Sequence, residues 1–306
     1  LMGEYVGLAY FAEVPLVIWN IQRMGPSTGL PTRTSQGDLK QAVSVSHGDT
    51  KHIVLLPGSA RECFEFGWKA FDVAERTQTP VFVLSDLDLG QNQWMSEPFE
   101  YPDIPMDRGK VLWEEDFEEF EAKHGKWGRY KDVDGDGIPY RTVAGNRHVG
   151  STYFARGTGH DAFANYSEDP DVWMEGMNRL NLKYETARQY VPDAIIEEME
   201  DSKIGIIAYG STTPAVIEAR DLLAKEGVKT DYLRLRALPI NDIVKEFVRK
   251  YDEIFVVEMN HNGQLREILS IEMPEESTKM TSSILNNGLS LTAEWIRDDI
   301  LAKKEK

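Results

Sequence analysis

The sequence predicts an α/β protein in which a doubly wound, mostly parallel sheet is followed by a second, smaller α/β domain. Short apolar runs alternate with amphipathic stretches along residues 15–86 and again along residues 204–303. This rhythm is typical of parallel strands joined by crossover helices. The stretch between them shows no clear periodicity, and 306 residues can bury two cores. We expect a first domain with a long irregular extension at 1–170, a linker at 171–200 and a second domain at 201–306.

The composition limits the possible ligands and locations. The formal net charge is −17, from 34 basic and 51 acidic side chains, which argues against binding to nucleic acid or to anionic membranes. No apolar run is long enough to cross a bilayer and no signal segment opens the sequence, so we expect a cytoplasmic protein. Cys63 is the only cysteine. An intrachain disulfide and a four-cysteine iron–sulfur or zinc site are therefore excluded, and any cluster must lie on another chain.

Residues 1–14 predict a helix that ends at Pro15. Tyr5, Leu8, Ala9 and Val14 recur near helical spacing. The sequence has no methionine at position 1 and no capping residue before Gly3. We therefore expect the chain to begin inside a helix, with a preceding portion missing.

The stretch 15–39 predicts a buried strand at 15–19, a loop, and a helix N-terminus at 34–38. Loops that leave the carboxyl ends of strands in open α/β sheets are common ligand sites. Arg23 can bind a carboxylate or phosphate through two parallel hydrogen bonds, and the hydroxyls of Ser27, Thr28 and Thr32 can complete the site. The alternative is an ordinary structural loop, because Gly, Pro, Ser and Thr are common in turns. Neither a P-loop nor a dinucleotide fingerprint is present.

The remainder of the first domain predicts further helices and strands. We expect a short helix at 39–46, buried strands at 52–59 and 81–86, and a long helix at 60–79 capped by Ser59. One side of the long helix gathers Cys63, Phe64, Trp68, Phe71 and Ala74, which we interpret as a core-facing surface.

Residues 95–170 carry only one expected element, an acidic helix near 114–123. So long an irregular stretch is usually functional or covered by a partner. Asp132, Asp134, Asp136 and Gly137 are spaced like the first half of a calcium loop, but position 143 is Val where an EF-hand needs Glu. An acidic turn is the favoured interpretation and a calcium site the alternative. His160 and Asp161 lack a further ligand at metal-binding spacing.

The last third of the chain returns to the strand and helix rhythm. The amphipathic helical stretch 171–200 is interrupted at Pro192, which suggests a linker. Beyond it we expect strands at 204–211, 230–238 and 253–260, and helices at 212–226, 240–251, after Asn262-Gly263, and at 290–303.

The loop sequence QRMGPSTGLPTRTSQGDL at 22–39 closely resembles the alpha-subunit loop of the 2-oxoacid:ferredoxin oxidoreductases. These thiamine-diphosphate enzymes act on pyruvate, 2-oxoglutarate or branched-chain 2-oxo acids. The resemblance continues, in the family's order, through residues 81–94, 128–146, 160–170 and 253–265. It therefore covers nearly the whole chain.

The resemblance implies a thiamine-diphosphate pyrimidine-domain-like fold followed by a transketolase C-terminal-like domain. It implies oxidative decarboxylation of a 2-oxo acid to acyl-CoA and CO2, with coenzyme A as co-substrate and electrons passing to ferredoxin. Arg23 would bind the substrate carboxylate, supported by Thr28 and Thr32. The missing N-terminal part would supply another substrate-binding threonine and the glutamate that activates the cofactor.

The same resemblance implies a symmetric hetero-oligomer. Thiamine diphosphate and Mg²⁺ would be held mainly by a beta subunit. That partner would also carry the iron–sulfur cluster. No catalytic residue is identified here, and we expect the isolated chain to be inactive.

Two other classes remain open. A transketolase-type thiamine enzyme would lack iron–sulfur absorbance in the purified complex. A non-catalytic α/β anion-binding scaffold would give no coenzyme A-dependent reduction of a viologen dye. The sequence does not indicate which 2-oxo acid is used.

Overall fold

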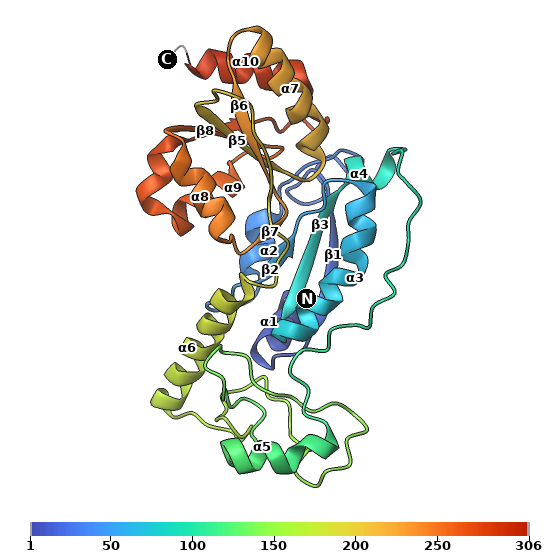
Figure 1. The fold of residues 1–306 in the computed structure, drawn as a ribbon, viewed down its shortest axis with the longest axis vertical. Coiled ribbons are helices and arrows are strands. Elements are labelled where there is room, and N and C mark those ends of the chain that lie inside the picture. The colour runs from blue at the N-terminus through green and yellow to red at the C-terminus, as the bar shows by residue number, and fades with distance from the viewer. Residues whose placement is uncertain (1, 305–306) are drawn as a thin grey trace.

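The computed structural model describes residues 2–304, which form two mostly parallel sheets (Figure 1). The first has the order β1-β3-β2-β7, and only β7 is antiparallel to its neighbour. The second has the order β4-β6-β5-β8-β9, and only β4 is antiparallel. The strands of the first sheet are β1 (Leu16–Gln22), β2 (Ile53–Leu55), β3 (Pro80–Asp86) and β7 (Ala237–Leu238). Those of the second are β4 (Ile195–Glu197), β5 (Ile204–Tyr209), β6 (Thr230–Leu235), β8 (Glu253–Glu258) and β9 (Met280–Ile284). The predicted α/β class is confirmed.

Helices cover both faces of each sheet. The helices of the first half are α1 (Met2–Phe11), α2 (Leu39–Ser44), α3 (Ala60–Thr77), α4 (Leu87–Gln91), α5 (Phe117–His124) and α6 (Pro170–Ala187). Those of the second half are α7 (Thr213–Lys225), α8 (Asp242–Lys250), α9 (Gln264–Glu272) and α10 (Ala293–Lys304), and short 3-10 turns lie at Glu114–Asp116, Gly210–Thr212 and Pro274–Lys279. None of the helices in the described range is long and apolar enough to cross a membrane.

The alternation of side chains along the strands explains the doubly wound arrangement of the first sheet. Val81 and Val83 of β3 pack with α3 on one face, whereas Phe82 and Leu84 pack with α1 and α2 on the other. Successive side chains of a strand point to opposite faces, so a strand buried on both sides reads as a continuous apolar run. This is the pattern of VFVL at 81–84.

The second sheet follows the same rule. Ile206 on β5 packs with α7 and α10, while its neighbour Ile207 packs with α8 and α9. The α8 and α9 side of this core is continuous with residues of the first sheet, including Val54 and Leu84. The two sheets therefore share one hydrophobic core, and the division into domains at 170 and 200 stays a prediction.

Two helices bury faces that differ from the residues picked out by helical spacing. Near α1, Tyr5, Leu8 and Val14 are exposed and Ala9 is buried, and the helix also buries Val6 and Tyr10. The helix is apolar around much of its circumference, so periodicity does not select the side that meets β3. On α3, Ala74 is buried as predicted, but the other buried residues lie outside the predicted set: Glu62, Phe66, Ala70, Val73 and Thr77.

A second apolar side of α3 is covered by irregular chain. Phe64 stacks on Phe99, with 4.9 Å between ring centroids, and meets Tyr101 edge-on at 5.2 Å. Figure 1 shows this segment passing along the outside of α3 after α4. The predicted face that includes Phe64 and Phe71 is thus not the sheet-facing one, and Phe71 is 47% exposed. The predicted cap is confirmed, because the Ser59 hydroxyl accepts a hydrogen bond from the Glu62 N–H at 3.1 Å.

The predicted burial of the first strand is also wrong. β1 is the edge strand of its sheet in the described residues and continues to Gln22. Leu16, Trp19 and Ile21 are exposed. The sequence did not indicate β4 or β9, and β4 lies inside the expected linker. The strand predicted at 230–238 is divided into β6 and β7, and β7 pairs with β2 of the first sheet.

Residues 95–169 are irregular, as predicted, apart from the turn at Glu114–Asp116 and α5. They are anchored through a buried charge cluster around Glu13. Its carboxylate accepts hydrogen bonds from Arg179 and from Lys183, the latter at 2.9 Å, and Arg129 donates to its backbone carbonyl at 2.7 Å. Burial alone would raise the pKa of the Glu13 carboxyl, but the opposite charges of Arg179 and Lys183 outweigh it and hold that pKa well below its usual range.

Candidate functional site

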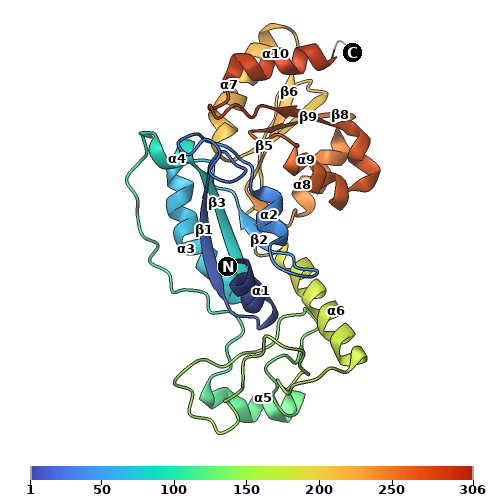
Figure 2. The ribbon, with the colours of Figure 1, turned by 180° about the vertical axis from the view of Figure 1, so that it is seen from behind.

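The loop that leaves the carboxyl end of β1 forms one wall of a cavity of about 690 Å³. Figure 2 shows this loop in blue between the two sheets. The opposite wall is the turn between β8 and α9, together with Asn286 after β9. The polar lining side chains are those of Asn20, Arg23, Ser27, Ser35, Asp38, Gln41, Asn260, His261, Asn262, Gln264 and Asn286.

Arg23 is half-buried and lines this cavity. Its Nη1 donates a hydrogen bond to the Thr28 carbonyl oxygen at 3.0 Å, which holds the guanidinium within its own loop. A guanidinium has five N–H donors, so this bond leaves others to face a ligand. Among residues 2–304 no carboxylate forms an ion pair with Arg23. The geometry is that of a held cation beside a polar cavity.

The hydroxyls of Thr28 and Thr32 are not placed in the Arg23 cavity. Both are exposed and neither lines the cavity; Thr28 contributes its backbone carbonyl to Arg23. Thr34 is the buried threonine of the loop, and its hydroxyl accepts a hydrogen bond from the Asp88 N–H at 3.3 Å. The proposed hydroxyl contacts of Thr28 and Thr32 with substrate remain a prediction.

Asp38 marks the start of α2, as predicted, but its side chain does not cap the helix. Its Oδ2 accepts a hydrogen bond from Asn20 Nδ2 at 3.0 Å, and its backbone N–H donates to Gln22 Oε1 at 3.0 Å. These bonds tie the end of the loop back to β1. The carboxylate of Asp38 therefore faces the same cavity as Arg23, and this wall carries one positive and one negative group.

The opposite wall was missed by sequence reasoning. Asn260, His261, Asn262 and Gln264 all follow the carboxyl end of β8, which is parallel to β5 and β9. The sequence did contain a pattern that could have indicated this wall, because amide and imidazole side chains at the carboxyl end of a parallel strand are typical of a binding loop. What the sequence did not show is that this turn meets the Arg23 loop.

Gln36 joins the two walls. It is 1% exposed; its Nε2 donates to the Tyr209 carbonyl at 2.9 Å, and its Oε1 accepts from the Met259 N–H at 2.9 Å. Its own backbone N–H donates to the Met259 carbonyl at 2.7 Å. Beside it, burial raises the pKa of the Asp86 carboxyl, against a hydrogen bond from the Ser211 hydroxyl at 2.6 Å.

The donor set of the cavity suits a polar anion rather than a metal. Amides and hydroxyls can donate and accept, and Arg23 supplies the matching charge. No group of three His, Cys, Asp or Glu side chains within residues 2–304 could hold a metal ion. The described lining residues thus combine one cation with amide and hydroxyl groups that can hydrogen-bond a carboxylate.

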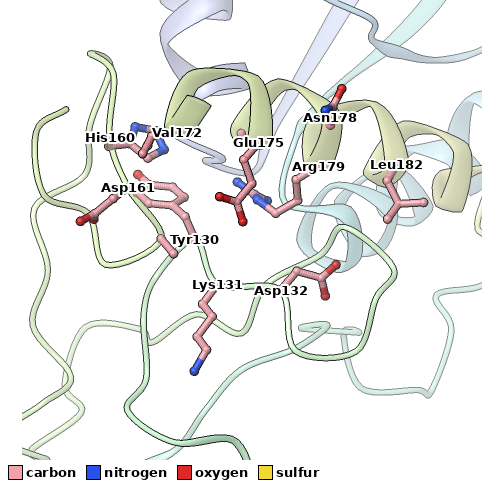
Figure 3. Close-up of a pocket in the computed structure, with 12 residues that line it drawn as sticks. Tyr130, Lys131, Asp132, His160, Asp161, Val172, Glu175, Asn178, Arg179 and Leu182 are labelled. Carbon is pink, nitrogen blue, oxygen red and sulfur yellow. The ribbon is translucent and has the colours of Figure 1, made fainter. Parts of the chain in front are cut away.

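A second cavity, of about 390 Å³, lies between α6 and the irregular stretch (Figure 3). Glu175 and Arg179 point from α6 toward the segment that holds Tyr130. His160 packs on Tyr130, with 3.9 Å between ring centroids, and burial lowers the pKa of its imidazole. Asp161 accepts two backbone N–H groups, those of residues 163 and 165, so it shapes a turn.

The structure favours the acidic-turn interpretation of residues 132–137. The Asp132 carboxylate accepts the N–H groups of Gly135 and Gly137, at 2.9 and 2.7 Å. Lys110 Nζ lies 2.7 Å from both Asp134 Oδ2 and Asp136 Oδ1. A lysine ammonium therefore occupies the position between these two carboxylates that a bound cation would take.

Comparison with known proteins decides the family. Residues 1–136 match the family described as "Pyruvate flavodoxin/ferredoxin oxidoreductase, thiamine diP-bdg". The chain is 34% identical over 276 residues to the 2-oxoglutarate synthase subunit KorA of Methanothermobacter thermautotrophicus, a match that covers 88% of this chain and 68% of the relative. The chain belongs to the 2-oxoacid:ferredoxin oxidoreductase alpha-subunit family. The predicted resemblance is confirmed.

Members of this family differ in length. The alpha subunit of 2-oxoacid:ferredoxin oxidoreductase 2 of Aeropyrum pernix is 33% identical over 299 residues, and the match covers 95% of this chain but only 44% of that subunit. Among solved structures, 2-oxoglutarate:ferredoxin oxidoreductase from Magnetococcus marinus, with 2-oxoglutarate, coenzyme A and succinyl-CoA bound, superposes with a TM-score of 0.84 at 27% identity. That superposition covers 99% of this chain and 51% of the other. This chain therefore spans about half the length of these two relatives.

Proposed function

We propose that this chain is the alpha-subunit portion of a thiamine-diphosphate-dependent 2-oxoacid:ferredoxin oxidoreductase, and that Arg23 binds the carboxylate of the 2-oxo acid. The reaction is oxidative decarboxylation to acyl-CoA and CO2, with electrons passing to ferredoxin. Bound thiamine diphosphate supplies the electron sink for the decarboxylation. This chain binds the substrate carboxylate.

One observation carries the proposal. Arg23 is held by the Thr28 carbonyl beside a cavity of about 690 Å³ whose lining is rich in amides. Moving a carboxylate out of water is unfavourable unless its charge is matched, and a guanidinium matches it without risk of losing its own proton. The amides of Asn260, Asn262 and Gln264 can orient the rest of a polar substrate from the other wall.

The cofactors and partners are proposed to lie mainly on a beta subunit. That subunit would hold thiamine diphosphate, Mg²⁺ and an iron–sulfur cluster, coenzyme A would be the co-substrate, and the complex would be a cytoplasmic symmetric hetero-oligomer. The single cysteine of the chain supports this division for the iron–sulfur cluster. For the metal and diphosphate, the division is supported by the Gly-Asp-Gly of residues 135–137, because its Asp136 is paired with Lys110 at 2.7 Å.

The intact complex tests the proposal. Coenzyme A-dependent reduction of a viologen dye should be measured with pyruvate, 2-oxoglutarate and 2-oxoisovalerate in turn. Reduction with at least one of them is the expected result, and the preferred one names the substrate. A complex that contains bound thiamine diphosphate and iron–sulfur clusters yet reduces no dye with any of the three contradicts the proposal.

A further inference from the structure

Glu258, the last residue of β8, is a fully buried carboxylate behind the cavity wall formed by the β8–α9 turn. Its Oε2 accepts hydrogen bonds from the Leu265 N–H and from Asn260 Nδ2, both at 2.7 Å, and its Oε1 accepts from the Arg266 N–H at 3.1 Å. Leu265 and Arg266 lie in the first turn of α9, whose N–H groups have no partner within the helix. One carboxylate thus holds both the start of α9 and the side chain of Asn260.

Asn260 connects Glu258 to the Arg23 loop through hydrogen bonds. Its Nδ2 also donates to the Gln36 carbonyl at 3.2 Å, and its Oδ1 accepts the N–H groups of Gly263 and Gln264, at 2.8 and 3.2 Å. A carboxylate can only accept, so Glu258 fixes which end of the Asn260 amide points toward it and toward Gln36. The chain of bonds runs from α9 through Glu258 and Asn260 to the loop.

We infer that Glu258 is a positioning residue for the Arg23 cavity, acting through Asn260 to hold the β8–α9 turn and the Arg23 loop at one spacing. This inference rests on the function proposed above for that cavity. Glu258 itself does not line the cavity, whereas Asn260, His261, Asn262 and Gln264 do. Glu258 therefore affects substrate binding only through the position of these lining residues.

A simple helix cap would not require this arrangement. Burying a carboxylate costs free energy, and burial raises the pKa of Glu258 to about 7 even though the Leu265 N–H and Asn260 act against the rise. Capping α9 needs an acceptor for its N–H groups but not a bond to Asn260. The link to Gln36, on a loop more than two hundred residues away in sequence, is the part that concerns the cavity.

The first test is Glu258→Gln in the intact complex. Glutamine keeps the shape but has one oxygen, and its NH2 group would face a donor, so at least one of the three bonds is lost. We expect KM for the 2-oxo acid to rise about tenfold while kcat falls less than about threefold. Glu246→Gln, an exposed carboxylate on α8, is the matched control and should change neither. An unchanged KM in Glu258→Gln, with wild-type folding, overturns the inference.

The second test asks whether the effect passes through Asn260. If it does, the double variant Glu258→Gln/Asn260→Ala should show a KM close to that of Asn260→Ala alone, because the two residues act as one unit. KM increases that multiply in the double variant would overturn the coupling. This comparison is independent of any loss of stability common to the single variants.

Hydrogen exchange separates the inference from the proposed function. The Gln36 amide, which donates to the Met259 carbonyl at 2.7 Å, should exchange faster in Glu258→Gln, together with the amides of residues 263–266. Faster exchange at 265 and 266 alone would mean that Glu258 only caps α9, and would overturn the inference. A wild-type complex that turns over no 2-oxo acid would contradict the proposed function. The exchange experiment would still show whether Glu258 is coupled to the Gln36 amide.

Discussion

Replacing Arg23 is the most direct test of the proposed substrate site. Its guanidinium is half-buried, is held by the Thr28 carbonyl and faces the amide-lined cavity. A hydrogen bond to a charged group is worth about 1.5–3 kcal/mol, so Arg23→Ala should lower kcat/KM for the 2-oxo acid by roughly ten- to a hundredfold or more. Arg23→Lys keeps the charge but loses the two-point contact, so it should recover only part of the loss.

Steady-state viologen reduction by the intact complex measures this effect, with the melting temperature measured alongside it. The chain offers a matched control in Arg33, an exposed arginine of the same loop whose side chain does not line the cavity. Arg33→Ala removes the same charge and should cost far less activity. Thr28→Val keeps the carbonyl that holds Arg23 and should also have a small effect. Thiamine diphosphate affinity should hardly change in any variant.

Three results would refute this reasoning. If Arg23→Ala leaves kcat/KM intact, the loop does not bind the substrate carboxylate. If it lowers activity only as far as it lowers the melting temperature, Arg23 is a structural residue. If Arg33→Ala has the same effect as Arg23→Ala, the site requires only general positive charge.

Three further predictions concern the cofactor, the extension and the buried charge cluster. The isolated chain should bind thiamine diphosphate with Mg²⁺ weakly or not at all, and submicromolar binding in titration calorimetry would contradict this. Residues 95–170 should lie across a partner subunit or a second copy, so hydrogen exchange should show them protected in the complex and open in the free chain; equal protection in both states would exclude it. Glu13→Gln should destabilise the fold by about 3–5 kcal/mol, because it leaves Arg179 and Lys183 buried without a counter-charge. The folded-state pKa of Glu13 is lowered, so its ionised carboxylate stabilises the fold above the ordinary glutamate pKa of 4.5, and this stabilisation is lost as the pH falls below that value. Thermal unfolding measured against pH should show this loss in wild type and in the exposed control Glu4→Gln, but not in Glu13→Gln.

The sequence by itself determined the local elements. VFVL at 81–84 is apolar at every position and forms β3, buried on both faces. Ser59 predicted a helix start, and its hydroxyl caps α3. Arg23, in a loop at the end of a strand, lines a cavity. These features depend on residues close together in the chain, where periodicity, capping and turn chemistry act.

The tertiary structure decided what depends on distant neighbours. β1 reads as a buried strand but lies at a sheet edge, because burial depends on which strands flank it. Because α1 is apolar around much of its circumference, periodicity did not show that Val6 and Tyr10 would be its buried residues. The second wall of the Arg23 cavity comes from the β8–α9 turn, held through Gln36 and Asn260. Contacts across more than two hundred residues carry no signal in local spacing, so only the fold brings these groups together.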